Sequence, residues 1–152
     1  NEGDVMKNDK VIAELRELIR LLVRHLGLLE KSEASCCGIS LAQCHAIIEI
    51  GRACEISLNE LAEILGLDNS TMSRTVNNLV EKDYVLRETD ANDRRYVKIK
   101  LTEKGHKLYS SIESSMNNYY KDIMDSIPEE KRSQVIESLR LLDNAIKGKK
   151  CC

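Results

Sequence analysis

The sequence predicts a mainly α-helical chain with one small β-hairpin wing. Three observations lead to this fold class. Apolar residues recur at helical spacing along most of the 152 residues. The composition is aliphatic, with no Trp, no Phe and a single Pro, as is common in helical proteins packed by Leu, Ile and Val. Only two short segments, 84–88 and 96–102, alternate apolar and polar residues as strands do.

The N-terminal part is predicted to form two helices around a polar loop. The stretch VIAELRELIRLLVRHLGLL has a wide apolar stripe and predicts a long helix from about Lys10 to Lys31. Met6 is expected to be the natural start, so the fold is predicted without the preceding NEGDV. After the loop KSEASCCG, Ser40 is expected to cap a helix that ends near Gly51.

Two further helices are predicted to be joined by a tight turn. Ser57 and Glu60 form an S-x-x-E capping box before LNELAEIL, and Gly66 suits the position just beyond its end. The turn LDNS leads to the helix STMSRTVNNLVEKD. The apolar residues of that helix share one face and are expected to be buried: Met72, Val76, Leu79 and Val80.

The C-terminal part begins with the hairpin. Between its strands lies TDANDRR, whose Asp and Asn residues favour a turn. Thr102 is expected to cap a helix that runs to about Ser126. Pro128 suits the first turn of a last helix, whose early Glu129 and Glu130 complement the helix dipole.

A helix pair followed at once by a hairpin predicts a winged helix-turn-helix, a DNA-binding arrangement. In the second helix of the pair, Arg74 has the length for bidentate contact with a guanine edge, and Asn77 for an adenine edge or a phosphate. Arg94 and Arg95 at the hairpin tip suit the narrow minor groove. Asp93 is a poor DNA contact, and its expected role is to hold an arginine by a charge-assisted hydrogen bond.

Charge supports this interpretation only modestly. The net charge is −2, but residues 69–104 hold eight Lys and Arg against six Asp and Glu, a local net charge of +2. No apolar run of about 18 residues and no signal peptide can be recognised, so we expect a cytoplasmic protein without membrane contact, whose thiols stay reduced. No catalytic triad order or glycine-rich phosphate loop is present in the sequence, and we do not expect an enzyme.

The segment from Leu58 to Gly105 resembles the multiple-antibiotic-resistance-regulator (MarR) family of bacterial transcription factors. The most specific pieces are S-T-x-S-R, the D-x-x-D-R-R wing and the L-T-E-K-G exit. Asp83 departs from the glycine usual before the wing, but Asp tolerates the left-handed conformation. The resemblance implies a homodimer on a palindromic duplex DNA operator, usually as a repressor, with Arg95 in the minor groove. It implies recognition by Ser70, Thr71, Ser73, Arg74, Asn77 and Asn78.

Three regions are expected: an N-terminal dimerisation helix and loop at 1–38, a winged helix-turn-helix domain at 39–105, and dimerisation helices with a cysteine tail at 106–152. The residues themselves support the dimer, because a small winged domain cannot cover the apolar side chains of both terminal regions. These side chains are Val11, Ile12, Leu15, Leu18, Ile19, Leu22, Leu26, Leu29, Ile136, Leu139, Leu142 and Ile146.

Five of the six cysteines lie in two groups outside the winged domain's reading helix and hairpin: Cys36, Cys37, Cys44, Cys151 and Cys152. We hypothesise that they meet at the dimer interface and sense a signal. One alternative is a thiophilic metal or metalloid ion such as As, Cd, Zn or Cu. Others are an iron–sulfur cluster, thiol oxidation, or unrelated thiols with no cofactor. Cys54 is expected to be buried packing.

Bridging of these thiols is expected to change the spacing of the two reading helices and release the operator. Three alternatives to this function stay open. The same class of regulator can respond to a small aromatic effector with structural cysteines. The chain can be a thiol oxidoreductase, although C-x-x-C is absent, or a winged helix that contacts only protein.

Overall fold

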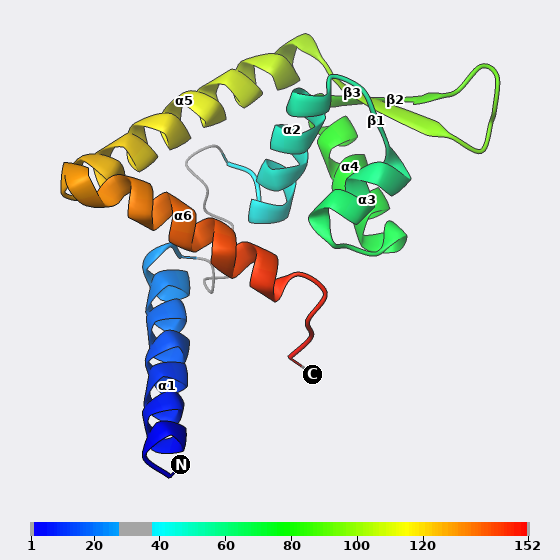
Figure 1. The fold of residues 1–152 in the computed structure, drawn as a ribbon. Coiled ribbons are helices and arrows are strands. Elements are labelled where there is room, and N and C mark those ends of the chain that lie inside the picture. Colours follow the sequence, from blue (N-terminus) through cyan, green and yellow to red (C-terminus); the bar gives the residue numbers. More distant parts are fainter. Residues whose placement is uncertain (1, 28–37, 152) are drawn as a thin grey trace. The chain divides into compact units, whose positions relative to one another are not determined.

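A computed structural model describes residues 2–27 and 38–151 (Figure 1). The chain divides into two compact units, Asn1–Leu41 and Ala42–Cys152. None of the described helices is both long and apolar enough to cross a lipid bilayer. The elements follow the order α1 (Glu2–His25), α2 (Leu41–Ala53), β1 (Ile56–Ser57), α3 (Leu58–Leu65), α4 (Asn69–Glu81), β2 (Val85–Thr89), β3 (Val97–Leu101), α5 (Glu103–Asp125) and α6 (Glu129–Ile146). The predicted fold class, mainly helical with a small hairpin, is confirmed.

Helix α1 differs from its predicted bounds at both ends. It begins at Glu2 rather than near Lys10, because no proline interrupts the polar residues before the apolar stripe. It ends at His25, and Gly27 follows with φ +71°, a left-handed conformation that glycine adopts without steric cost. The Gly27 N–H donates to the Arg24 carbonyl at 3.0 Å, which closes the last turn. The predicted end at Lys31 lies outside the described residues.

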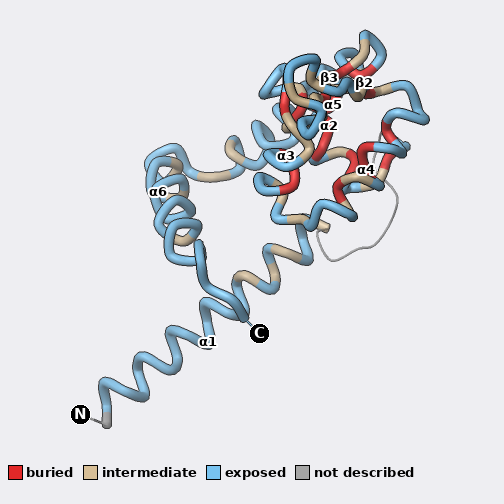
Figure 2. The backbone as a smooth tube through the Cα atoms, turned by 90° about the vertical axis from the view of Figure 1, so that its right-hand side faces the viewer, coloured by how far each residue is buried: buried red, intermediate tan, exposed pale blue. Residues whose placement is uncertain are grey.

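The winged domain has three strands where the sequence predicted two. β3 lies in the middle, and β1 and β2 pair antiparallel on either side of it. β1 has only two residues, with Ile56 opposite Ile99, so it is too short to show an alternating pattern in the sequence. Buried residues gather in α2, α3, α4 and this sheet, whereas α1 and α6 are almost entirely exposed (Figure 2).

The helix pair α3–α4 forms as predicted. The Ser57 hydroxyl caps α3 by accepting the Glu60 N–H at 3.1 Å, and Gly66 occupies the end position. On α4, Met72, Val76 and Leu79 are fully buried. Val80 is 38% exposed, so its predicted burial is wrong. Thr75 is buried instead, because its hydroxyl donates to the Thr71 carbonyl at 3.0 Å and is therefore satisfied inside the domain.

The hairpin leads into two long helices. The Thr102 hydroxyl caps α5 by accepting the Gly105 N–H at 2.9 Å, as predicted. Pro128 precedes α6, which begins with Glu129 and has no buried residue. Several apolar side chains of α5 and α6 are exposed: Met116, Tyr119, Tyr120, Ile123, Ile136, Leu139, Leu141 and Ile146.

Cys54 corrects another prediction, because it is exposed rather than buried. α2 continues past Gly51 to Ala53, and Cys54 then reverses the chain with φ +65°. The left-handed conformation costs a residue with a Cβ about 1–2 kcal/mol. Cys54 lies just after the end of α2, and the sequence has no glycine at this position.

Candidate nucleic-acid interface

The start of α4 is organised by Asp68, which the sequence analysis assigned only to a turn. One carboxylate oxygen accepts the Thr71 N–H at 2.7 Å, and the other accepts the Thr71 hydroxyl at 2.8 Å. These bonds, the backbone one first, hold the pKa of Asp68 below its ordinary value. Asp is a preferred N-cap residue, so its place just before NSTMS was a usable signal.

The residues predicted to read DNA from α4 lie together opposite its buried side. We call them the polar face of α4: Ser70, Thr71, Ser73, Arg74, Asn77 and Asn78. Ser70, Arg74 and both asparagines are exposed, while Thr71 and Ser73 are half-buried. The Thr71 hydroxyl donates to Asp68, so its oxygen is left to act as an acceptor. The positive end of the helix dipole lies at the same end of α4.

The other end of α4 is held by a compact junction. Asp83 adopts φ +65°, as expected for the residue that replaces the usual glycine. Its N–H donates to the Val80 carbonyl at 2.9 Å, and the Tyr84 N–H donates to the Leu79 carbonyl at 2.9 Å. These two bonds form a Schellman motif. The Thr102 hydroxyl donates to the Asp83 carbonyl at 2.7 Å, which ties the end of α4 to the start of α5.

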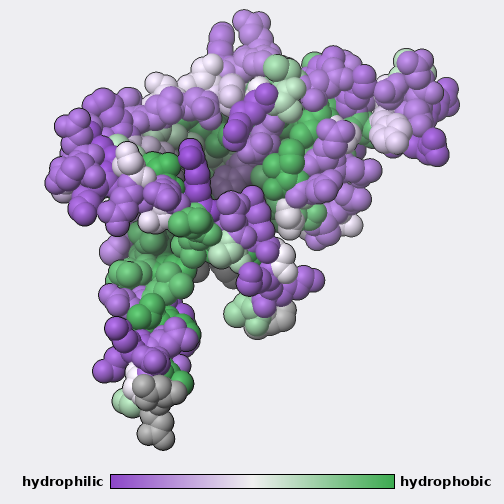
Figure 3. Space-filling model, in the orientation of Figure 1, coloured by the Kyte–Doolittle hydropathy of each residue, from purple (hydrophilic) through white to green (hydrophobic). Residues whose placement is uncertain are grey.

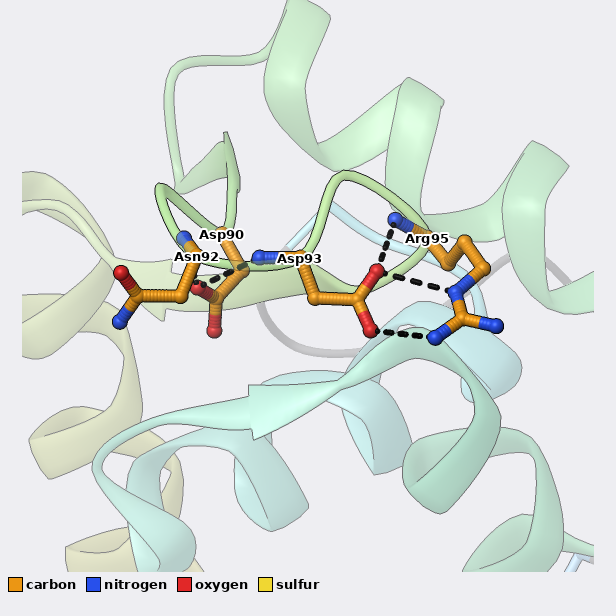
Figure 4. A network of polar contacts seen from close by, with 4 residues as sticks. All are labelled: Asp90, Asn92, Asp93 and Arg95. Atoms are coloured by element: carbon orange, nitrogen blue, oxygen red, sulfur yellow. Dashed lines mark hydrogen bonds and ion pairs between the residues drawn. The ribbon is translucent and has the colours of Figure 1, made fainter.

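The tip of the wing presents an arginine held by a carboxylate. Asp93 accepts three hydrogen bonds from Arg95, from the backbone N–H and Nε at 3.0 Å each and from one terminal nitrogen at 2.9 Å (Figure 4). The Arg95 side chain is nevertheless 87% exposed. The side-chain bonds lower the pKa of Asp93 and raise that of Arg95. The prediction that Asp93 holds an arginine is confirmed. Arg94 is exposed beside it.

The turn of the wing is shaped by Asp90. Its Oδ1 accepts the Asn92 N–H at 2.8 Å and the Asp93 N–H at 3.4 Å. The Asp90 N–H donates to the Tyr96 carbonyl at 2.9 Å, which closes the hairpin. The Asn92 bond, first among several causes, lowers the pKa of Asp90. The tip is therefore an ordered turn that carries its arginines outward.

The base of the wing holds an ion network that sequence reasoning missed. Glu55 lies 2.8 Å from Lys98 Nζ and 3.4 Å from Lys100 Nζ, both on β3. The hydrogen bond from Lys98 is the main cause that lowers the pKa of Glu55, and the same bond raises that of Lys98. No local pattern reveals these pairs, because β1 brings Glu55 beside β3 across more than 40 residues.

Arg87 is a second residue that the sequence analysis missed. It lies on β2, is half-buried, and donates a hydrogen bond from one terminal nitrogen to Oδ1 of Asn77 on α4. The wing and the polar face of α4 are therefore joined by a side-chain contact. The alternating pattern of β2 places Arg87 on the same side as Val85, which was the available signal.

The predicted cysteine sensor is only partly described. Cys36, Cys37 and Cys152 lie outside the described residues. Cys44 is half-buried in α2, and Cys151 is exposed. Within residues 2–27 and 38–151, no group of three or more His, Cys, Asp and Glu side chains is arranged to hold a metal ion.

Residues 38–95 match the MarR family. The helix pair and most of the wing are therefore similar in sequence to those of the MarR family. The matched segment contains α2, the helix pair and the hairpin up to Arg95, so it covers the polar face of α4 and the wing tip.

Solved structures extend the similarity beyond residues 38–95. A MarR transcriptional regulator from Methanosarcina mazei is 26% identical, with a TM-score of 0.73 over 89% of this chain and 98% of that one. Streptococcus pneumoniae FabT in complex with DNA is 23% identical, with a TM-score of 0.81 over 91% and 99%. A mutant of Escherichia coli MarR complexed with operator DNA is 23% identical, with a TM-score of 0.71 over 86% and 94%. The terminal helices are thus part of the shared fold.

Proposed function

We propose that this chain is a MarR-family transcriptional regulator that binds duplex DNA through α4 and the wing. The observation that carries the proposal is the pairing of an exposed polar face on α4 with an outward arginine at an ordered wing tip. The polar face suits the major groove, where Arg74 reaches a guanine edge. Arg95, oriented by Asp93, suits the minor groove. Two similar chains are solved as DNA complexes, which supports this proposal.

The test is selection of bound duplexes from a random library, followed by affinity measurements on the enriched sequence. Arg74→Ala is expected to weaken binding roughly 5- to 100-fold and to relax preference at one base pair. Arg95→Ala is expected to weaken binding without changing the base preference at any position read in the major groove. Arg52→Gln, which removes an exposed charge from the end of α2, is the control. Failure of the wild-type chain to enrich any sequence would leave the protein-contact alternative.

We further propose that the binding unit is a homodimer on a palindromic operator, acting as a repressor. Two observations support the dimer. α1 exposes a line of apolar side chains, visible as the hydrophobic strip on that helix in Figure 3. None of the residues of α6 is buried. The apolar side chains of this strip, with Leu26 just beyond the end of α1, are between 41% and 58% exposed: Val11, Ile12, Leu15, Leu18, Leu22 and Leu26. A monomer rarely leaves such a surface uncovered.

If the chain binds as a dimer, the selected sequence is expected to contain two half-sites whose centres lie about 34–36 Å apart on the duplex. Sedimentation would give twice the 17.2 kDa chain mass. Leu15→Glu is expected to yield a monomer with at least tenfold weaker operator binding, because charge on the apolar stripe opposes association. A monomeric wild type with full affinity would refute the dimer.

The signal that releases DNA is proposed to act through the thiols, by a metal or metalloid ion or by oxidation. Supporting this, Cys44 lies in α2 and Cys151 lies beyond the end of α6, so both are outside α4 and the hairpin. Operator binding should weaken with As(III), Cd(II) or peroxide in the wild type and not in a variant with Ser at Cys36, Cys37, Cys44, Cys151 and Cys152. Thiol-independent release by a salicylate-like compound would favour the aromatic-effector alternative instead.

A further inference from the structure

We infer that Arg87 and Asn77 form a phosphodiester clamp, so that Asn77 contacts the DNA backbone rather than a base edge. The inference rests on the proposed DNA binding. It assigns a binding role to Arg87 and decides between the two contacts that the sequence left open for Asn77.

Arg87 reaches α4 from the packed side of the sheet. β2 alternates its side chains, and Val85, two positions before Arg87, is only 1% exposed. The residue opposite Arg87 is Ile99, which is fully buried. The base of the Arg87 side chain is therefore fixed in the domain, and its guanidinium emerges at Asn77. Such anchoring reduces the side-chain entropy that a surface arginine loses on binding a ligand.

The charge of Arg87 is not neutralised within the described part of the chain. Three other cations of the wing have carboxylate partners: Arg95 has Asp93, and both Lys98 and Lys100 have Glu55. In residues 2–27 and 38–151, no ion pair involves Arg87, whose bonded partner is the neutral amide of Asn77. A half-buried guanidinium next to a helix that faces DNA therefore presents its full charge to an anion.

The bond to Asn77 determines which groups the pair presents. A guanidinium has only donors, so the Asn77 oxygen must turn toward it, and the amide NH₂ then points elsewhere. The two side chains together offer donors. An adenine edge requires both the oxygen and the NH₂ of an asparagine, whereas a phosphodiester offers acceptors alone. The geometry therefore favours a phosphate.

The position on α4 agrees with this assignment. Asn77 follows Ser73 and Ser70 by four and seven residues, so the three lie along one line of the polar face. Asn77 is at the end of that line nearest β2, at the margin between α4 and the wing. A helix that lies in the major groove meets phosphates at its margins and bases along its middle.

The test measures affinity against salt for the selected operator and for single-base variants of it. Arg87→Gln is expected to reduce the slope of log affinity against log salt by about 0.9, because one phosphate contact is lost. Asn77→Ala is expected to weaken binding roughly tenfold on every sequence alike, since phosphate contacts carry no base preference. Arg87→Lys should keep the slope and weaken binding, because an ammonium lacks the planar fork. Arg52→Gln is the matched charge control.

The results for the variants separate the clamp from the proposed function. If Asn77→Ala relaxes discrimination at one base pair, Asn77 reads a base and the inference is overturned. If Arg87→Gln leaves the salt slope at the wild-type value, Arg87 does not contact a phosphate. Thermal unfolding of each variant distinguishes lost contacts from lost folding, and Arg87→Lys supplies a folded variant in either case. Absence of duplex binding by the wild type would overturn the proposed function and the clamp together.

Discussion

Gly105 lies at the point where α4, the wing and α5 meet, and Gly105→Ala should destabilise the packing of all three. A Cβ at this position would lie 2.0 Å from the Tyr84 carbonyl oxygen and 3.2 Å from the Leu101 Cβ. A carbon–oxygen contact of about 3.3 Å is normal, so the separation would have to grow by roughly 1.3 Å. The obstacle is backbone, which cannot turn away as a side chain can.

The shift would disturb the hydrogen bonds of the junction. The Tyr84 carbonyl accepts the Thr102 N–H at 3.0 Å, and the Thr102 hydroxyl accepts the Gly105 N–H at 2.9 Å. Overpacking costs about 1–3 kcal/mol, and a lost hydrogen bond adds about 1 kcal/mol. The better helix propensity of Ala recovers less than about 1 kcal/mol. We therefore expect the free energy of unfolding to fall by about 2–3 kcal/mol.

Urea unfolding at a fixed chain concentration measures this change. Gly3→Ala is the matched control, because a Cβ there meets nothing within 4 Å and Gly3 lies in a helix. It should leave stability unchanged or slightly raised. A Gly105→Ala variant that unfolds within about 0.5 kcal/mol of the wild type would refute the argument that the close approach to Tyr84 requires glycine.

Three further predictions concern single residues. Cys54→Gly should raise the free energy of unfolding by up to about 1 kcal/mol, because it relieves the left-handed conformation; a decrease in urea unfolding would contradict this. The stabilisation from ionised Asp68 is fully present above its ordinary pKa of 3.8 and is lost as pH falls through the lower folded value. The stability difference between wild type and Asp68→Asn should therefore shrink upon acidification, and a constant difference would exclude the linkage. Asp93→Ala should weaken operator binding in anisotropy titrations, since Arg95 loses its three bonds; unchanged affinity would show that Arg95 needs no orientation.

The local features of the winged domain were predictable because their causes are local. The Ser57 cap depends on a residue three positions away, and the pairing of Asp93 with Arg95 on one two positions away. The left-handed Asp83 was expected from its place between helix and wing. The burial predicted for Val80 was wrong, because the apolar pattern of α4 does not by itself decide which side chains are buried. Thr75 replaced Val80 in the core because its hydroxyl found a partner one turn back.

By itself, the sequence determined the order of helices and hairpin, the polar face of α4 and the arginine at the wing tip. These follow from periodicity, capping and turn chemistry, which act over a few residues. Only the tertiary structure decided that Glu55 neutralises Lys98 and Lys100, and that Arg87 holds Asn77. Both contacts join elements that folding brings together. No spacing along the chain specifies them, because the partners are selected by the pairing of β1 with β3 and by the packing of α4 against β2.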